Sequence, residues 1–167
     1  MEFVQPIRSL KQIETIKKLL KQQSLRDYCL FVLGINSGLR ISDLLKLKIS
    51  DVSEHGKVKD RIRLRETKTN KFKDFPISDN AKSAIREYLK SRQYNENEPL
   101  FISRKNKGIL LRQRAYKILN EAARSIGIKE KIGTHTLRKT FGYHAYNNGY
   151  DIAIIQKLFN HSSPGIT

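Results

Sequence analysis

The run from Tyr28 to Leu33 constrains the fold of this chain most. It reads Tyr-Cys-Leu-Phe-Val-Leu, inside a segment that Ser24 and Asp27 can open as a helix and that Gly38 can close. A helix that is apolar on every side has no face to offer to water, so other elements must surround it. The run is also far shorter than the roughly 20 residues that a membrane span requires. We therefore expect a central helix, and no transmembrane segment.

Amphipathic helices are expected to cover this central helix. Over residues 9–21, apolar residues recur at helical spacing, and Ser9 with Gln12 can form a capping box. The apolar face of this first helix comprises Leu10, Ile13, Ile16, Leu19 and Leu20. The same reasoning predicts further helices over residues 42–48, 81–89, 112–126 with Gly127 as the stop, 135–148 with Gly149, and 151–160.

A β-hairpin is predicted between the helix over residues 42–48 and the helix over residues 81–89. Ile62 and Leu64 alternate with arginines, which is the period of a half-buried strand, and a second extended run covers residues 71–77. The polar residues 67–70 between them favour a turn. No repeat or linker divides the 167 residues. We therefore expect a single domain over residues 1–167 that is mainly α with a small antiparallel β-sheet (α+β).

The charge of the chain indicates a polyanionic partner. Thirty-three lysines and arginines against 16 aspartates and glutamates give a formal net charge of +17. Such a charge predicts strong, salt-dependent attraction to nucleic acid, although a protein that only coats phosphates would show the same attraction. The single cysteine, Cys29, cannot form an internal disulfide, and the first ten residues lack the order of a signal peptide. A cytoplasmic location is expected.

Common metal and nucleotide motifs are absent from the sequence. It contains no GxxxxGK[ST] loop, no HExxH, no CxxC and no carboxylate cluster suited to magnesium, so no cofactor or metal is expected. What the sequence offers instead is a set of basic and imidazole residues in polar or glycine-flanked settings. These candidate catalytic residues are Arg40, Lys68, His135, Arg138 and His161.

The spacing of these residues favours phosphate chemistry. His135 and Arg138 stand three residues apart at a predicted helix start, so they share a face near unpaired backbone N–H groups. With Arg40, a second guanidinium could complete a clamp that neutralises a pentacoordinate phosphorus transition state. His161 could donate a further hydrogen bond, and Lys68 could serve as a general acid for a departing oxygen.

Each residue taken alone has a plainer interpretation. Arg40 could be a solvated charge or the partner of a nearby carboxylate such as Asp43. Lys68 is one of many lysines, and a histidine at a helix start, such as His135, is more often a cap or a surface group. The order and context of the whole set favour the phosphate clamp over these separate interpretations.

Four segments that carry these residues resemble the catalytic domain of the tyrosine recombinases, the phage integrase family. Residues 37–45, Ser-Gly-Leu-Arg-Ile-Ser-Asp-Leu-Leu, are similar to the first arginine box of that family. Residues 134–141, Thr-His-Thr-Leu-Arg-Lys-Thr-Phe, resemble its second box, H-x-L-R. Residues 158–163 resemble the segment with the next histidine, and residues 66–69 the hairpin lysine. The four segments occur in the family's order over nearly the whole chain.

This resemblance implies a role for each candidate residue. Arg40 and Arg138 would grip the scissile phosphate, and His161 would donate a hydrogen bond to a phosphate oxygen. His135 would accept or manage the proton of the nucleophile, and Lys68 would protonate the leaving 5′-hydroxyl. No cofactor is implied.

The resemblance also implies a tyrosine nucleophile that forms a 3′-phosphotyrosyl link to DNA, so that strands rejoin without ATP or metal. The family places this tyrosine after the last histidine, but residues 162–167 contain none. Tyr143, Tyr146 and Tyr150 precede His161 and are expected to be structural. We therefore expect the nucleophile just beyond Thr167. Without that tyrosine, residues 1–167 alone are not expected to cleave DNA. We also expect a DNA-clamping domain before residue 1.

The function that these observations favour is site-specific recombination of double-stranded DNA. The resemblance implies a homotetramer on synapsed DNA that is a monomer when free, encoded by a bacterium or phage and associated with the nucleoid. Two alternatives stay open. One is a nonenzymatic DNA-binding module, including a truncated or degenerate recombinase, and the other is DNA relaxation of the type IB topoisomerase kind.

Overall fold

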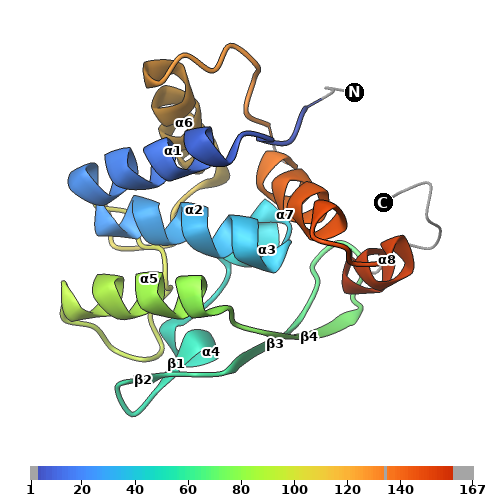
Figure 1. Cartoon of the computed structure of the whole chain (residues 1–167). Helices are drawn as coiled ribbons and strands as arrows, with labels where there is room; N and C mark the ends of the chain where they lie inside the picture. The colour runs from blue at the N-terminus through green and yellow to red at the C-terminus, as the bar shows by residue number, and fades with distance from the viewer. Residues whose placement is uncertain (1–3, 134, 160–167) are drawn as a thin grey trace.

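The computed structural model describes residues 4–133 and 135–159. It is mainly helical with small antiparallel sheets, as predicted (Figure 1). In chain order the elements are α1 (Leu10–Gln23), α2 (Leu25–Ser37), α3 (Ile41–Leu45), α4 (Ile49–Val52), β1 (Ser53–Glu54), β2 (Lys57–Val58), β3 (Arg61–Arg65), β4 (Phe72–Pro76), α5 (Asp79–Lys90), α6 (Arg112–Ser125), α7 (Thr136–Asn147) and α8 (Ile152–Phe159).

Helix α2 is the central helix, as its all-round apolar character predicts. It lies between α1 and α5, and α7 packs against it as well (Figure 1). Residues 29–33 are almost fully removed from solvent, while Tyr28 is half-buried against the core. Each large apolar side chain buried in this way contributes about 1.5–3 kcal/mol. None of the helices in the described part of the chain has the length and apolar character to cross a membrane.

Helix α1 begins where its cap predicts. The Ser9 hydroxyl accepts a hydrogen bond from the Gln12 backbone N–H at 3.2 Å, which is half of the expected capping box. The apolar face that covers α2 is narrower than expected. Ile13 and Ile16 are buried, but Leu10 is 68% exposed. The first residue of α1 therefore lies outside the core, and the buried face of the helix begins at Ile13.

The predicted hairpin is β3 paired with β4, in a register that runs from Arg61 opposite Pro76 to Arg65 opposite Phe72. A second hairpin, β1 with β2, was not predicted, because strands of two residues are too short to show a period. Its turn, at His55 and Gly56, has positive φ at both residues (51° and 76°).

The helix expected over residues 42–48 is wrong in extent. The structure has α3 from Ile41 to Leu45 and a separate α4 that begins at Ile49. The break occurs because Lys48 adopts an extended backbone, with φ −95° and ψ 160°, and forms a β-bridge with Pro99. A residue held in this bridge cannot continue a helix.

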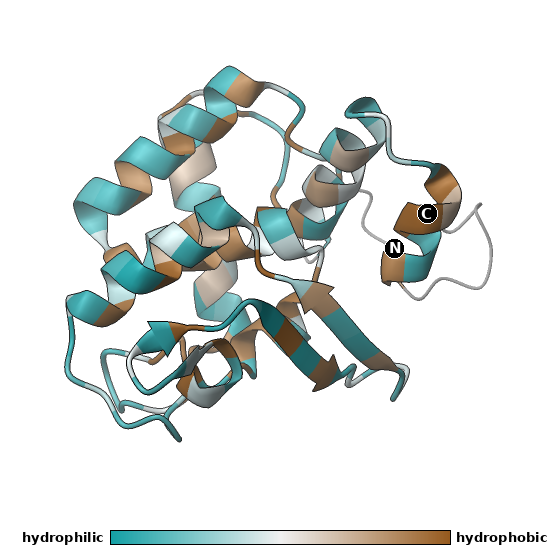
Figure 2. Cartoon of the chain, turned by 60° about the horizontal axis from the view of Figure 1, so that its bottom comes forward, coloured by the Kyte–Doolittle hydropathy of each residue, from teal (hydrophilic) through white to brown (hydrophobic). Residues whose placement is uncertain are grey.

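Helices α7 and α8 lie at one end of the molecule, beside the turn of the β3–β4 hairpin (Figure 1). Helix α7 approaches α2 closely at Gly34, where an added Cβ would lie 2.5 Å from the Leu137 Cδ1 atom. Helix α8 is mostly apolar, and its ribbon is largely brown in Figure 2. It buries Ile155 and Phe159 against its neighbours. This end of the molecule therefore gathers segments that are far apart in the sequence.

Candidate active site

Arg40 is placed by the end of α2. Gly38 takes the left-handed conformation that ends this helix (φ 65°), and its N–H bonds to the Gly34 carbonyl. Arg40 then precedes α3 in an extended conformation, and its guanidinium forms an ion pair with the Glu66 carboxylate. The Glu66 side chain is buried, at 1% exposed, and that of Arg40 is partly buried, at 13% exposed. A charged pair in such surroundings holds the guanidinium in a defined direction.

The hairpin is fixed to α3 by Asp43. Its Oδ1 atom accepts two hydrogen bonds from Thr67, one from the backbone N–H and one from the hydroxyl, both at 2.9 Å. Arg40 does pair with a carboxylate, as its plainer interpretation has it, but the partner is Glu66 and not the suggested Asp43. Asp43 instead positions the turn that carries Lys68, which is exposed one residue after Thr67.

Arg138 joins three segments of the site. It is 5% exposed, and its guanidinium donates to the carbonyls of Gly38 at 3.2 Å and Phe159 at 2.7 Å. The guanidinium also lies 4.3 Å from the centre of the Phe159 ring. Burial, followed by the charge of Arg40, lowers the pKa of Arg138 to about 10. The Arg138 guanidinium is therefore still protonated near neutral pH, and it lies close enough to Arg40 for the two groups to repel each other.

His135 stands directly before α7, on the side of the helix start where Arg138 lies. Partial desolvation lowers the pKa of His135 below its usual 6.5, and nearby positive charges lower it further: those of Arg138, Lys68, Lys139 and Arg40. The charge of Lys68 therefore lies close enough to His135 to lower its pKa. The imidazole is neutral at neutral pH and can accept a proton.

The structure brings four of the five predicted residues together: Arg40, Lys68, His135 and Arg138. The fifth, His161, lies outside the described residues.

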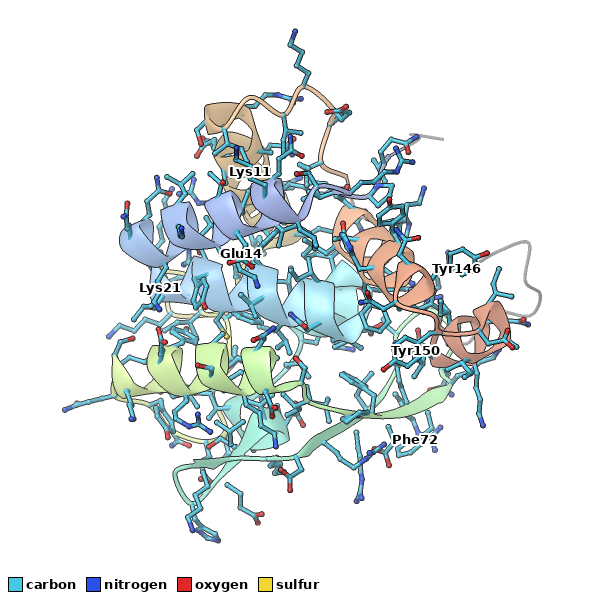
Figure 3. The ribbon with its side chains drawn as sticks, viewed as in Figure 1. Lys11, Glu14, Lys21, Phe72, Tyr146 and Tyr150 are labelled. Atoms are coloured by element: carbon cyan, nitrogen blue, oxygen red, sulfur yellow. The ribbon has the colours of Figure 1, made fainter. Side chains whose placement is uncertain are left out.

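Three tyrosines lie on or just after α7, and two of them, Tyr146 and Tyr150, are 60% and 56% exposed. Figure 3 labels these two side chains. Within the described ranges, no group of three or more histidines, cysteines and carboxylates could hold a metal ion.

Sequence reasoning missed two residues of this site, Glu66 and Lys73. The Lys73 side chain is 5% exposed, and its Nζ atom has no hydrogen-bond partner within the described ranges. Burial lowers its pKa to about 7, with further lowering by Arg138 and Arg40 and an opposing effect of Asp43. A signal was present in the sequence, because Lys73 shares the inward face of its strand with Phe75.

Comparison with known proteins identifies the family. The model of the Phage integrase family matches residues 9–167. The chain belongs to this family. The probable integrase/recombinase YoeC of Bacillus subtilis (strain 168) is 49% identical to this integrase-family domain over 167 residues, which is all of this chain and 88% of YoeC.

Two solved structures share the fold of this integrase-family domain. The crystal structure of XerA recombinase superposes with a TM-score of 0.81 at 23% identity, over 99% of this chain and 58% of XerA. XerH site-specific recombinase, bound to palindromic difH substrate in a post-cleavage complex, gives 0.76 at 21% identity, over 99% and 48% of the two chains. The integrase-family domain thus has the fold of a tyrosine recombinase catalytic domain, and spans about half of each of these recombinases.

Proposed function

We propose that this integrase-family domain carries out the cutting and rejoining of double-stranded DNA in site-specific recombination. The observation that carries the proposal is the meeting of Arg40 and Arg138. A hydrogen bond from Arg138 to the Gly38 carbonyl spans 100 positions of the sequence and brings the two arginines to one place. The formal charge of +17 supplies the attraction to DNA that such a site needs.

In this proposal the two guanidinium groups bind the scissile phosphate. Each offers a planar set of N–H donors that matches the oxygens of a phosphate. Their charges stabilise the additional negative charge that develops on a pentacoordinate phosphorus, which is the work that a metal ion performs in other enzymes. Glu66 holds Arg40 in place for this contact. His161 adds a hydrogen bond to a phosphate oxygen.

The remaining groups move protons. His135, neutral at neutral pH, accepts the proton of a tyrosine hydroxyl supplied from beyond residue 167. The tyrosine oxygen bonds to phosphorus, the bond to the 5′-oxygen breaks, and Lys68 protonates that oxygen. In the second step a 5′-hydroxyl attacks the 3′-phosphotyrosyl link and releases the tyrosine. Each step breaks one phosphate ester bond and forms another, so no ATP is consumed.

Double-stranded DNA is the proposed partner, in a homotetramer on synapsed DNA at the bacterial nucleoid. The complex of XerH with its palindromic difH substrate supports this partner, because that recombinase shares the fold of this domain. A palindromic site presents equivalent halves to identical subunits.

The test is recovery of a covalent protein–DNA complex from cells that express the full-length protein. The complex is purified under denaturing conditions, its DNA is sequenced, and the peptide attached to DNA is identified by mass spectrometry. We expect a tyrosine joined to a DNA 3′ end at defined sites, and loss of the complex in Arg40→Ala. DNA binding without any adduct would indicate a binding module. Plasmid relaxation without recombinant products would indicate topoisomerase-like chemistry.

Duplex binding by residues 1–167 should weaken steeply with salt. Each neutralised phosphate contributes a slope of about −0.9 to the plot of log affinity against log salt concentration. A site with about six phosphate contacts loses about 10³-fold in affinity between 50 and 200 mM salt. Fluorescence anisotropy with a labelled duplex measures the slope. A nearly flat response would contradict a phosphate-binding surface.

The His135 imidazole should titrate below pH 6.5 in the free protein, because desolvation and the surrounding positive charges favour its neutral form. NMR detection of its ring proton over pH 5–8 gives the midpoint. Replacing Lys68 by glutamine removes one of these charges and should raise the midpoint. Lys57→Gln, on the hairpin of β1 and β2, is the matched control and should leave the midpoint of His135 unchanged. A midpoint at or above 6.5 would contradict the arrangement.

A further inference from the structure

A buried lysine lies among the groups of the proposed phosphate site, and the roles given above do not use it. Lys73, on β4 opposite Leu64, is 5% exposed. Within residues 4–133 and 135–159, its Nζ atom has no hydrogen-bond partner. Burial of an ammonium group without such a partner is costly, so lysine is almost never fully buried in this way.

The groups that face Lys73 come from three other elements. Arg138 of α7 and Arg40, at the start of α3, bring positive charge, and Asp43 of α3 brings negative charge. The Nζ atom lies 5.6 Å from the centre of the Phe75 ring and 6.0 Å from that of Phe159 on α8. These ring faces offset only part of the lost hydration. Lys73 therefore lies beside two guanidinium groups and the Asp43 carboxylate, and the Glu66 carboxylate of the same site is paired with Arg40.

With a neutral Lys73 amine, the charges of Arg40 and Arg138 are already offset by the carboxylates of Asp43 and Glu66, so a bound phosphate would add a negative charge that nothing else in the site offsets. Arg138 keeps its proton near neutral pH, whereas Lys73, with a pKa of about 7, is the group whose protonation responds to the local charge. An incoming phosphate diester would add a negative charge beside the two arginines, and a nearby negative charge favours the protonated form of an amine.

We propose that Lys73 is a third cation of the phosphate site, and that its amino group takes up a proton when a DNA phosphate binds beside Arg40 and Arg138. The inference rests on the proposed function, because it requires the phosphate to bind there. It gives Lys73 a role distinct from that of Lys68, which is exposed on the hairpin turn.

Proton uptake on DNA binding follows by linkage. The pKa of Lys73 in the free protein is about 7, so at pH 6 the amine is already mostly protonated and uptake is small. At pH 8 the free amine is mostly neutral, and uptake should approach about one proton per bound site. Duplex affinity should therefore fall as pH rises above 7.

Calorimetric titration of a duplex oligonucleotide into the protein measures this uptake, when it is repeated at pH 6 and pH 8 in buffers with different ionisation enthalpies. Lys73→Met removes the amine at nearly constant size, and Lys73→Arg fixes the positive charge. At pH 8, both variants should take up about one proton fewer per bound site than the parent protein does. At pH 8, Lys73→Met should bind DNA about tenfold more weakly than Lys73→Arg, which is the change expected for one favourable charge contact. His135→Gln should retain the uptake.

Folding is followed by circular dichroism on the same samples. Lys73→Met should melt at or above the temperature of the parent protein, because it removes a costly buried amine. Equal uptake by the parent protein and Lys73→Met would overturn the inference while leaving the proposed function standing. Failure of the parent protein to bind duplex DNA would instead overturn the proposed function.

Discussion

Replacing Arg138 by lysine should lower the rate of covalent adduct formation on DNA by about 10²- to 10³-fold, which is the usual cost of removing one well-placed donor to a developing negative charge. Lysine keeps the positive charge but not the planar set of donors, so it cannot hold the Gly38 and Phe159 carbonyls and a phosphate at once. Duplex affinity should change by less than about tenfold, since charge dominates it. Quenched-flow assays with a nicked suicide duplex and the full-length protein measure the rate.

Arg124 supplies the matched control for this substitution. It also donates to two backbone carbonyls, those of Ile128 at 2.6 Å and Glu130 at 3.0 Å, but from its NH1 group alone and on α6. Arg124→Lys should therefore lower thermal stability without changing adduct formation. Equal losses of rate in the two variants would show that Arg138 acts only through the fold.

Replacing Gly38 by alanine should destabilise the protein by about 2–5 kcal/mol. The positive φ of 65° costs an alanine about 1–2 kcal/mol. The added Cβ would also lie 2.6 Å from Phe141 Cδ1 and 2.7 Å from Phe159 Cε1, and overpacking of this kind costs about 1–3 kcal/mol. Urea denaturation measures the change in the free energy of unfolding.

Gly56→Ala separates these two contributions. Gly56 also has a positive φ, 76°, but a Cβ there would meet nothing within 4 Å. Its cost should be only about 1–2 kcal/mol, from the backbone alone. The difference between the two variants gives the cost of displacing the phenylalanine rings, one of which contacts Arg138. If the two costs were equal, the rings would not be tightly packed at Gly38.

Much of the fold follows from local patterns in the sequence. The all-round apolar run placed α2 at the centre, Gly38 ended it, and alternating residues located the β3–β4 hairpin. Each of these signals lies within one element, where hydrophobic period and backbone preference decide the outcome. The two-residue strands β1 and β2 carry no such period, so they escaped prediction.

The candidate site was predicted in part for the same reason. Arg40, His135 and Arg138 stand out because helix ends and glycines surround them. Glu66 carries no local mark of its importance, and Lys73 is marked only by its place on the inward face of its strand. What makes them notable is that Arg40 and Arg138 lie beside them, and those contacts join residues far apart in the chain. Only the packing of α3 and α7 onto the hairpin reveals them.

The anchoring of Thr67 to Asp43 sets a limit on the length of the hairpin turn. Surface turns usually tolerate insertions, because nothing depends on their length. Here the proposed general acid, Lys68, follows its anchor by a single residue. One added residue between them could shift the amine by about 3.5 Å, which exceeds the reach of a hydrogen bond. The turn should therefore resist insertion on its Thr67 side and accept it after Lys68, which is a constraint that chemistry rather than folding imposes.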